Sequence, residues 1–343
     1  MKRCWRLFLF CWIQGLTTTH AWLSYAKLPT RTLRMSTSTE DWTPLNPQAL
    51  VAAPCLIEQT LCSPNEEGQP QLAKDVDYAK AVLEAWNEQE EDDWQAELRP
   101  VSYHNDILHG YWIRQNEPSD ARQPVVLFFH TGAGPHDLFL LWKATALVQQ
   151  VQCQVLICDV LGDASGWTWD SDRSRYNGVR DQLLQANGSK RPLLEERIQA
   201  ALDLVRSDRK VDASRMAAMG WCLGGHSILE LARMGGVRAL ATFHGVFDSK
   251  LPVEKREEAG DWAEVLICNG VEDPFVSDDS LEAALEILQS YGHRTSLLQL
   301  KGAKHGFTNP AQDFNENPAF AFHAESAEKA WRQAVALLQR TLA

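Results

Sequence analysis

Residues 219–226 read Met219-Gly220-Trp221-Cys222-Leu223-Gly224-Gly225-His226, and they fall where a short apolar strand pattern gives way to a helical one. Glycines two positions before and two positions after Cys222 indicate a strand-to-helix turn too sharp for bulky flanking side chains. Such a turn projects its central side chain above the sheet, at a helix N-terminus that favours a thiolate. Cys222 is therefore the candidate nucleophile, and the backbone N–H of Leu223 is a candidate donor to an acyl oxyanion. A buried cysteine in a glycine-rich turn is the alternative.

Strand and helix patterns alternate around this turn. Strand patterns cover residues 125–129, 155–160, 216–219, 239–243, 265–268 and 295–300, and helical patterns cover 138–148, 193–205, 223–234, 280–289 and 325–338. An alternation sustained over this length predicts the α/β class, with a doubly wound, mostly parallel sheet and helices on both faces. It leaves no room for a second domain of similar size.

Two polar residues follow the last two strand patterns. Asp273 comes just after residues 265–268, and His305 lies in the loop after residues 295–300. The carboxyl ends of parallel strands gather at one edge of a sheet, where such folds bind ligands. A nucleophile needs a base and the base needs an orienting group, so we expect His305 to be the base and Asp273 its orienter. Glu272 competes for that role, but Pro274 fixes an extended bend at Asp273 and favours it.

Three motifs at these separations resemble the dienelactone hydrolase family of the α/β-hydrolase superfamily, from about Gln123 to the C-terminus. They are Gly220-Trp221-Cys222-Leu223-Gly224-Gly225, Gly270-x-x-Asp273-Pro274 and His305-Gly306-Phe307. The resemblance implies a Cys-His-Asp triad that acts on a small-molecule ester, lactone or thioester without a metal or other cofactor. In that scheme Cys222 attacks, His305 moves the proton and Asp273 orients the imidazole.

The loop after residues 125–129 is expected to supply the second oxyanion donor, and we assign it to the backbone N–H of Gly132. Gly132 and Gly134 do not make a dinucleotide-binding loop, because Asp137 stands where the third glycine would be. The family archetype has a glutamate in this loop that holds the resting cysteine, and Thr131 stands in its place here. The archetype also has an arginine four residues after the triad histidine that binds a substrate carboxylate, where this chain has Asn309. Both departures argue against dienelactone itself as the substrate.

A polar loop, residues 162–180, overhangs the same strand ends in this interpretation. Its Trp167, Trp169 and Arg173 are candidate substrate-binding residues for an apolar substrate with an anionic group. Equally, the two tryptophans could have a structural role and pack the loop against the rest of the domain. His244, at the end of residues 239–243, points toward the same region, and for it a structural hydrogen bond is favoured over a catalytic role.

Charge argues against a polyanionic partner. The chain of 343 residues has 33 basic and 45 acidic side chains, a net charge of −12, so neither nucleic acid nor an anionic membrane surface is expected as a partner. Residues 1–38 contain six bases and no acid, which leaves 27 bases against 45 acids and a net charge of −18 for the remainder. The sequence indicates no oligomeric state.

The N-terminus has the pattern of a targeting segment. Residues 1–6 are basic, residues 7–16 are apolar but too short to span a bilayer, and Ala21 provides a small residue for cleavage. Residues 22–39 have the composition of a transit peptide. We therefore expect residues 1–38 to be a presequence that directs the chain into the secretory pathway. A plastid of the complex type is the expected destination, secretion or a luminal location is the alternative, and no stable membrane insertion is expected after processing.

Residues 39–100 are interpreted as a proline-rich arm followed by an acidic helix, and residues 101–343 as the hydrolase-like domain. The eight cysteines show no metal-ligand spacing. Cys153 and Cys158 lie five apart in a strand pattern, so they are expected to be core thiols on opposite faces of the sheet. Cys55 and Cys62 form a disulfide in an oxidising lumen or stay reduced in a stroma, and both alternatives remain open.

Two functions fit these residues. The first is hydrolysis of a carboxylic ester, lactone or thioester through Cys222. The second is a non-catalytic small-molecule-binding protein of the same fold, which the missing loop glutamate would explain. The intact order of nucleophile, acid and histidine favours the hydrolase. A peptidase has little support, because no separate cap or propeller domain is present to select peptides.

Overall fold

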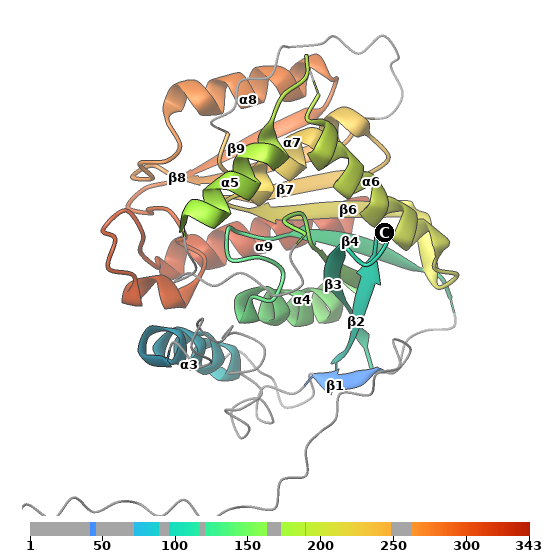
Figure 1. Ribbon diagram of the computed structural model, residues 1–343, viewed down its shortest axis with the longest axis horizontal. Helices are drawn as coiled ribbons and strands as arrows, with labels where there is room; N and C mark the ends of the chain where they lie inside the picture. The colour runs from blue at the N-terminus through green and yellow to red at the C-terminus, as the bar shows by residue number, and fades with distance from the viewer. Residues whose placement is uncertain are drawn as a thin grey trace, which may run out of the picture. The chain divides into compact units, whose positions relative to one another are not determined.

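The computed structural model describes residues 42–45, 72–88, 96–116, 121–162, 173–188, 190–247 and 262–343 (Figure 1). The strands in these residues are β1 (Thr43–Leu45), β2 (Ala96–Tyr103), β3 (Leu108–Gln115), β4 (Gln123–Phe129), β5 (Gln154–Cys158), β6 (Val211–Trp221), β7 (Ala239–Phe243), β8 (Glu264–Gly270) and β9 (Arg294–Leu300). The helices are α3 (Leu72–Glu88), α4 (Leu138–Val151), α5 (Arg173–Leu184), α6 (Pro192–Ser207), α7 (Gly224–Met234), α8 (Asp278–Ser290) and α9 (Ala324–Thr341), with a 3-10 helix, η1 (Pro310–Phe314).

The strands form one sheet in the order β1-β2-β3-β5-β4-β6-β7-β8-β9. From β1 to β5 the neighbours are antiparallel, and from β5 through β4 to β9 all are parallel. Strands β4, β5 and β7 are buried at every position, as expected of parallel strands covered on both faces. The predicted doubly wound, mostly parallel sheet is therefore confirmed, and it has the α/β-hydrolase arrangement.

Helices cover the two faces of this sheet (Figure 1), and each face has its own hydrophobic cluster. One joins the sheet to α5, α6, α7 and α8, and the other joins it to α3, α4 and α9. Cys158 belongs to the first cluster and Cys153 to the second, so the two thiols lie on opposite faces as predicted. Burial raises the pKa of both thiols above the usual range of cysteine, which makes them inert core residues at neutral pH.

The structure differs from the sequence-based prediction at three elements. Strands β1 and β2 were not predicted, because β2 contains Pro100 and lies near the polar edge of the sheet, where the apolar alternation is weak. Pairing with β3 along its whole length stabilises β2, which crosses the boundary predicted between residues 100 and 101. The loop predicted over residues 162–180 contains most of helix α5, which lacks a regular apolar repeat but buries Tyr176, Leu183 and Leu184.

The N-terminal strand β1 is fixed to the sheet beside Trp42. The Trp42 ring lies under two guanidinium groups, 4.9 Å from Arg99 of β2 and 3.7 Å from Arg114 of β3. The predicted presequence, residues 1–38, and the pair Cys55 and Cys62 lie outside the described residues. No helix in the described part of the chain is long and apolar enough to cross a membrane.

Candidate active site

Cys222 sits at the turn between β6 and α7 in a strained backbone conformation. Its φ is +50°, in the left-handed region that a side chain with a Cβ rarely adopts. A Cβ on Gly220 would lie 2.5 Å from the carbonyl oxygen of Gly224, and a Cβ on Gly224 would lie 2.5 Å from that of Phe129. Only glycine fits at both positions, as expected for a turn too sharp for larger flanking side chains.

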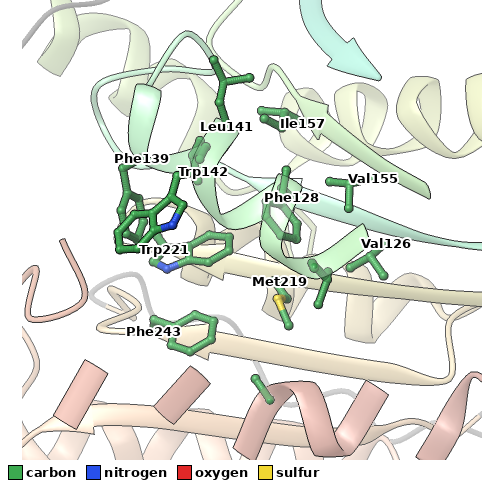
Figure 2. Packing of buried hydrophobic residues seen from close by; sticks show 14 of the residues in the cluster. Val126, Phe128, Phe139, Leu141, Trp142, Val155, Ile157, Met219, Trp221 and Phe243 are labelled. Carbon is green, nitrogen blue, oxygen red and sulfur yellow. The ribbon is translucent and has the colours of Figure 1, made fainter. Parts of the chain in front are cut away.

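The backbone around Cys222 is held from both sides. Its N–H donates to the Phe243 carbonyl of β7 at 3.3 Å, and its carbonyl accepts from Gly225 and Val246 at 2.9 and 3.0 Å. The neighbouring side chain, Trp221, is buried among aromatic rings. It stacks on Phe243 at 5.0 Å between centroids and meets Phe128 and Phe139 edge-on at 4.9 and 6.0 Å (Figure 2). With Trp221 anchored in the core, the next side chain, Cys222, is directed away from this cluster.

The structure brings His305 and Asp273 to Cys222 from the ends of two other strands. Asp273 follows β8, and its Oδ2 lies 2.8 Å from Nδ1 of His305, which follows β9. Asp273 also accepts the backbone N–H of Phe275 at 2.9 Å, whereas Glu272 is exposed to solvent. His305 in turn hydrogen-bonds to the Cys222 sulfur. Asp273, and not Glu272, is the carboxylate that hydrogen-bonds to His305.

The electrostatics of this pair favour charge separation. Burial raises the pKa of the Cys222 thiol, but the charge of His305, a hydrogen bond from His305 and two backbone N–H groups lower it, and the net pKa lies below the usual value. Burial lowers the pKa of His305, whereas the Cys222 thiolate and the hydrogen bond to Asp273 raise it, and the net pKa lies above the usual value. The two directions agree, because each group stabilises the charged form of the other.

The two backbone N–H groups on the Cys222 sulfur belong to Gly132 and Leu223, the residues predicted as oxyanion donors. The loop that carries Gly132 is tied at both ends. His130 bonds through Nδ1 to the Thr131 carbonyl at 2.6 Å and accepts the Val160 N–H at Nε2, at 3.1 Å. At the far end, the Tyr111 hydroxyl lies 2.7 Å from Nδ1 of His136. The Gly132 donor is thus presented by a loop fixed to β3 and to the segment that follows β5.

A narrow pocket with an empty volume of about 270 Å³, open at its mouth, leads to Cys222. Its lining comprises Thr131, Phe139, Cys222, His244, His305, Gly306, Thr308, Asn309, Gln312 and Phe320. Thr131 and His244 thus lie where predicted, beside the reacting groups. Thr131 accepts the Ala133 N–H at its Oγ1, at 3.1 Å, a contact that shapes the loop.

His244 is a buried, neutral neighbour of His305. Burial, followed by the charge of His305, lowers the pKa of His244 well below the usual value. Its Nε2 lies 3.2 Å from the Thr308 hydroxyl, and its ring meets that of His305 edge-on at 4.9 Å between centroids. These contacts match the structural hydrogen bond that was favoured for His244 over a catalytic role.

Some predicted residues lie outside the described part of the chain, and some residues that line the pocket were not predicted. Trp167, Trp169 and the side chain of Arg173 lie outside the described residues, so their role stays a prediction. Thr308 follows His305 in the same loop and Gln312 lies in the next element, η1. Closeness to His305 in the sequence was the signal that could have found them. Phe320 pairs with His305 as an isolated bridge, which no sequence pattern indicates. Within the described residues no group of three or more metal-ligating side chains gathers.

Comparison with known proteins identifies the family of this chain. The dienelactone hydrolase family model matches residues 109–342. An uncharacterised protein of Caenorhabditis elegans is 26% identical over 154 residues, 44% of this chain and 95% of that protein. A probable 2-oxo-3-(5-oxofuran-2-ylidene)propanoate lactonase of Bradyrhizobium sp is 23% identical over 169 residues, 48% of this chain and 65% of that protein. Among solved structures, a dienelactone hydrolase-like promiscuous phosphotriesterase, P91 from metagenomic libraries, has a TM-score of 0.60 at 28% identity, covering 72% of this chain and 99% of that one.

Proposed function

The chain belongs to the dienelactone hydrolase family and is a hydrolase that acts on ester bonds, and we propose that it cleaves a carboxylic ester, lactone or thioester through Cys222, His305 and Asp273. The observation that carries this proposal is the continuous chain of hydrogen bonds from Asp273 through His305 to Cys222, with two backbone donors at the sulfur. No cofactor takes part in the proposed reaction.

In the first half-reaction the Cys222 thiolate attacks the carbonyl carbon. The negative charge that develops on the carbonyl oxygen is stabilised by the N–H groups of Gly132 and Leu223. The His305 imidazolium then donates its proton to the leaving alkoxide or thiolate, and a thioester to Cys222 remains. A water molecule, deprotonated by His305, attacks this thioester and releases the acid. Asp273 keeps the imidazole ring oriented and stabilises its positive charge in both steps.

The polarity of the substrate follows from the pocket lining. The wall combines the Phe139 and Phe320 rings with the polar side chains of Thr308, Asn309 and Gln312, which suits a substrate with both apolar and polar groups. The lactonase and phosphotriesterase relatives support a small ester-type substrate. Thr131 and Asn309, which replace the glutamate and the arginine of the archetype, support a substrate other than dienelactone.

The test is a panel of esters and lactones assayed with Cys222→Ala and Cys222→Ser. We expect Cys222→Ala to abolish turnover without loss of fold, because the residue supplies the covalent step. Cys222→Ser is expected to be far weaker than wild type, since a site tuned for a thiolate activates a hydroxyl poorly. The matched control is Cys153→Ala, which removes a core thiol just before β5, at the opposite end of the parallel strands from the loops that line the pocket. Near wild-type turnover by Cys222→Ala would contradict the proposal.

We also propose that residues 1–38 direct the chain into the secretory pathway and on to a plastid of the complex type, with secretion or a luminal location as the alternative. The basic, apolar and small-residue order of residues 1–21 supports a signal, and the acid-free stretch that follows supports a transit segment. A fusion of residues 1–38 to a fluorescent protein, expressed in an alga with such plastids, tests this. A fusion that stays in the cytosol would contradict it.

A further inference from the structure

Tyr176 on α5 packs against the backbone of Gly132. Its side chain is 6% exposed and belongs to the hydrophobic cluster that includes Leu183, Leu194 and Ile198. A Cβ built on Gly132 would lie 2.8 Å from both Cζ and Oη of Tyr176, closer than Cβ atoms approach any neighbour. The phenol end of Tyr176 therefore occupies the space where a side chain on residue 132 would be.

Gly132 needs to be glycine for space and not for backbone conformation. It is absent from the described glycines with positive φ, which include its neighbour Gly134. The three atoms closest to its missing Cβ all belong to Tyr176. Hence the Tyr176 ring limits how close residue 132 approaches α5.

The hydrogen bonds of this loop fix the residues around Gly132. They hold Thr131 and Ala133 on either side and His136 at the end of the loop. Gly132 directs its own N–H at the Cys222 sulfur. Packing against Tyr176 is then the contact that supports the peptide of Gly132 from behind, and it comes from an element that is absent from the sequence-based prediction.

We propose that Tyr176 is a positioning residue for the oxyanion donor. Its ring, carried by α5, holds the Gly132 N–H at the place where the carbonyl oxygen becomes negatively charged. This inference rests on the proposed function, because Gly132 stabilises an oxyanion only if Cys222 attacks a carbonyl. Losing an oxyanion donor costs about 100- to 1,000-fold in kcat, and a displaced donor costs part of that.

The first test measures kcat and KM of four variants with one activated ester as the substrate. Tyr176→Phe keeps the ring and is expected to stay within about threefold of wild type. Tyr176→Ala removes the support and is expected to lower kcat by about 10- to 100-fold with KM little changed. Gly132→Ala places a methyl group against the ring and is expected to lower kcat at least as much. The double variant Gly132→Ala with Tyr176→Ala has room for the methyl group, so it should exceed the Gly132→Ala variant in kcat.

Two controls separate positioning from general destabilisation. Tyr291→Ala removes another buried phenol from the same hydrophobic cluster, at the end of α8, and should lower stability while leaving kcat unchanged. Tyr176→Leu keeps apolar volume and serves in place of Tyr176→Ala should the latter unfold. Circular dichroism melting of each variant shows that the folded protein is being assayed.

A second readout isolates the oxyanion step. Iodoacetamide alkylates Cys222 by displacing iodide at a saturated carbon, so no oxyanion forms. We expect the alkylation rate of Tyr176→Ala to stay within a few-fold of wild type while ester hydrolysis falls.

An equal fall in both rates would overturn the inference, since the thiolate and not the donor would then be affected. Unchanged hydrolysis by the variant lacking the ring, or a double variant no better than Gly132→Ala, would overturn it too. Failure of the proposed function gives a different result, because the Cys222→Ala variant would then remain active.

Discussion

At Cys222 and His305 one proton is shared by two side chains whose pKa values move in opposite directions, down for the thiol and up for the imidazole. The ion pair of the proposed mechanism exists between these two pKa values. Activity should rise on the acid side as the Cys222 thiol ionises and fall on the alkaline side as His305 loses its proton. Each limb is a property of the pair and moves when either member is perturbed.

Asp273→Asn should narrow this pH window and lower activity. The substitution removes the charge that helps to raise the pKa of His305, so the alkaline limb should move to lower pH. The weaker imidazolium stabilises the thiolate less, so the acid limb should move to higher pH. The measurement is kcat/KM against pH, with Glu272→Gln as the control at the exposed neighbouring carboxylate. An unchanged profile with full activity would show that Asp273 does not orient His305.

The residues of the site were predictable to the extent that they follow strand ends. Cys222, Asp273 and His305 each come directly after an apolar strand pattern, and the family motifs support the same three positions. Tyr176 and Phe320 reach the site through helix packing and an isolated bridge, which leave no periodic or motif signal in the sequence. Thr131 and His244 were found because they too lie at the ends of central strands, β4 and β7.

At the scale of elements, α4 is more deeply buried than its sequence pattern predicts. The predicted helix over residues 138–148 is confirmed, but nearly all of its side chains are buried, Lys143 included. The Lys143 ammonium lies 3.4 Å from the Trp142 ring centroid and 5.2 Å from that of Trp331 in α9. A lysine in an apolar helix usually marks the face that is exposed to solvent. The sequence of α4 alone therefore could not predict that Lys143 is buried against aromatic rings.

Lys143→Met should stabilise the protein at neutral and acidic pH. Burial lowers the pKa of Lys143 from 10.5 to about 7. Between these values the unfolded chain binds a proton that the folded chain does not, so wild-type stability should rise with pH across this interval. Removing the charge should raise the free energy of unfolding by about 1–2 kcal/mol at neutral pH and below, because the contacts with aromatic rings offset part of the burial cost. The gain should fade as the pH approaches 10.5.

Urea denaturation at several pH values measures this difference. Lys80→Met is the control, since Lys80 lies on the exposed face of α3 and its removal should change stability little at any pH. A Lys143→Met protein that is less stable than wild type at neutral pH would show that the aromatic contacts outweigh the cost of burying the charge.

At the scale of the whole molecule, the chain extends the family domain at its N-terminal side. The family match begins at residue 109, yet α3 packs on η1, and the side chain of Gln312 donates a hydrogen bond to the Tyr78 hydroxyl. Gln312 lines the pocket. Residues outside the matched region therefore support the pocket wall, which the pattern of α3 as an ordinary amphipathic helix did not reveal.

Removing residues 1–38 should leave folding and activity intact, because the described sheet begins with Trp42 and β1. Removing residues 1–45 should lower stability, since it deletes β1 and the contacts of the Trp42 ring with Arg99 and Arg114. The loss should be about 1–2 kcal/mol for the Trp42 contacts alone. Thermal unfolding of the two truncated proteins measures the difference. Aggregation or loss of cooperative unfolding in the shorter truncation would show that residues 1–38 are structural.

The charge separation at the nucleophile also makes the enzyme a target for peroxide. Oxidants attack thiolates and not thiols. Cys222 is partly exposed and its pKa is lowered, whereas Cys153, Cys158 and Cys268 are buried with raised pKa values. Hydrogen peroxide should therefore inactivate the enzyme by converting Cys222 to a sulfenic acid, with activity restored by dithiothreitol. Mass spectrometry after brief exposure should find the first added oxygen on Cys222, and an ester substrate in excess should slow the loss. The same ionisation that prepares the sulfur to attack a carbonyl should thus make the lifetime of activity depend on the redox state of the surroundings.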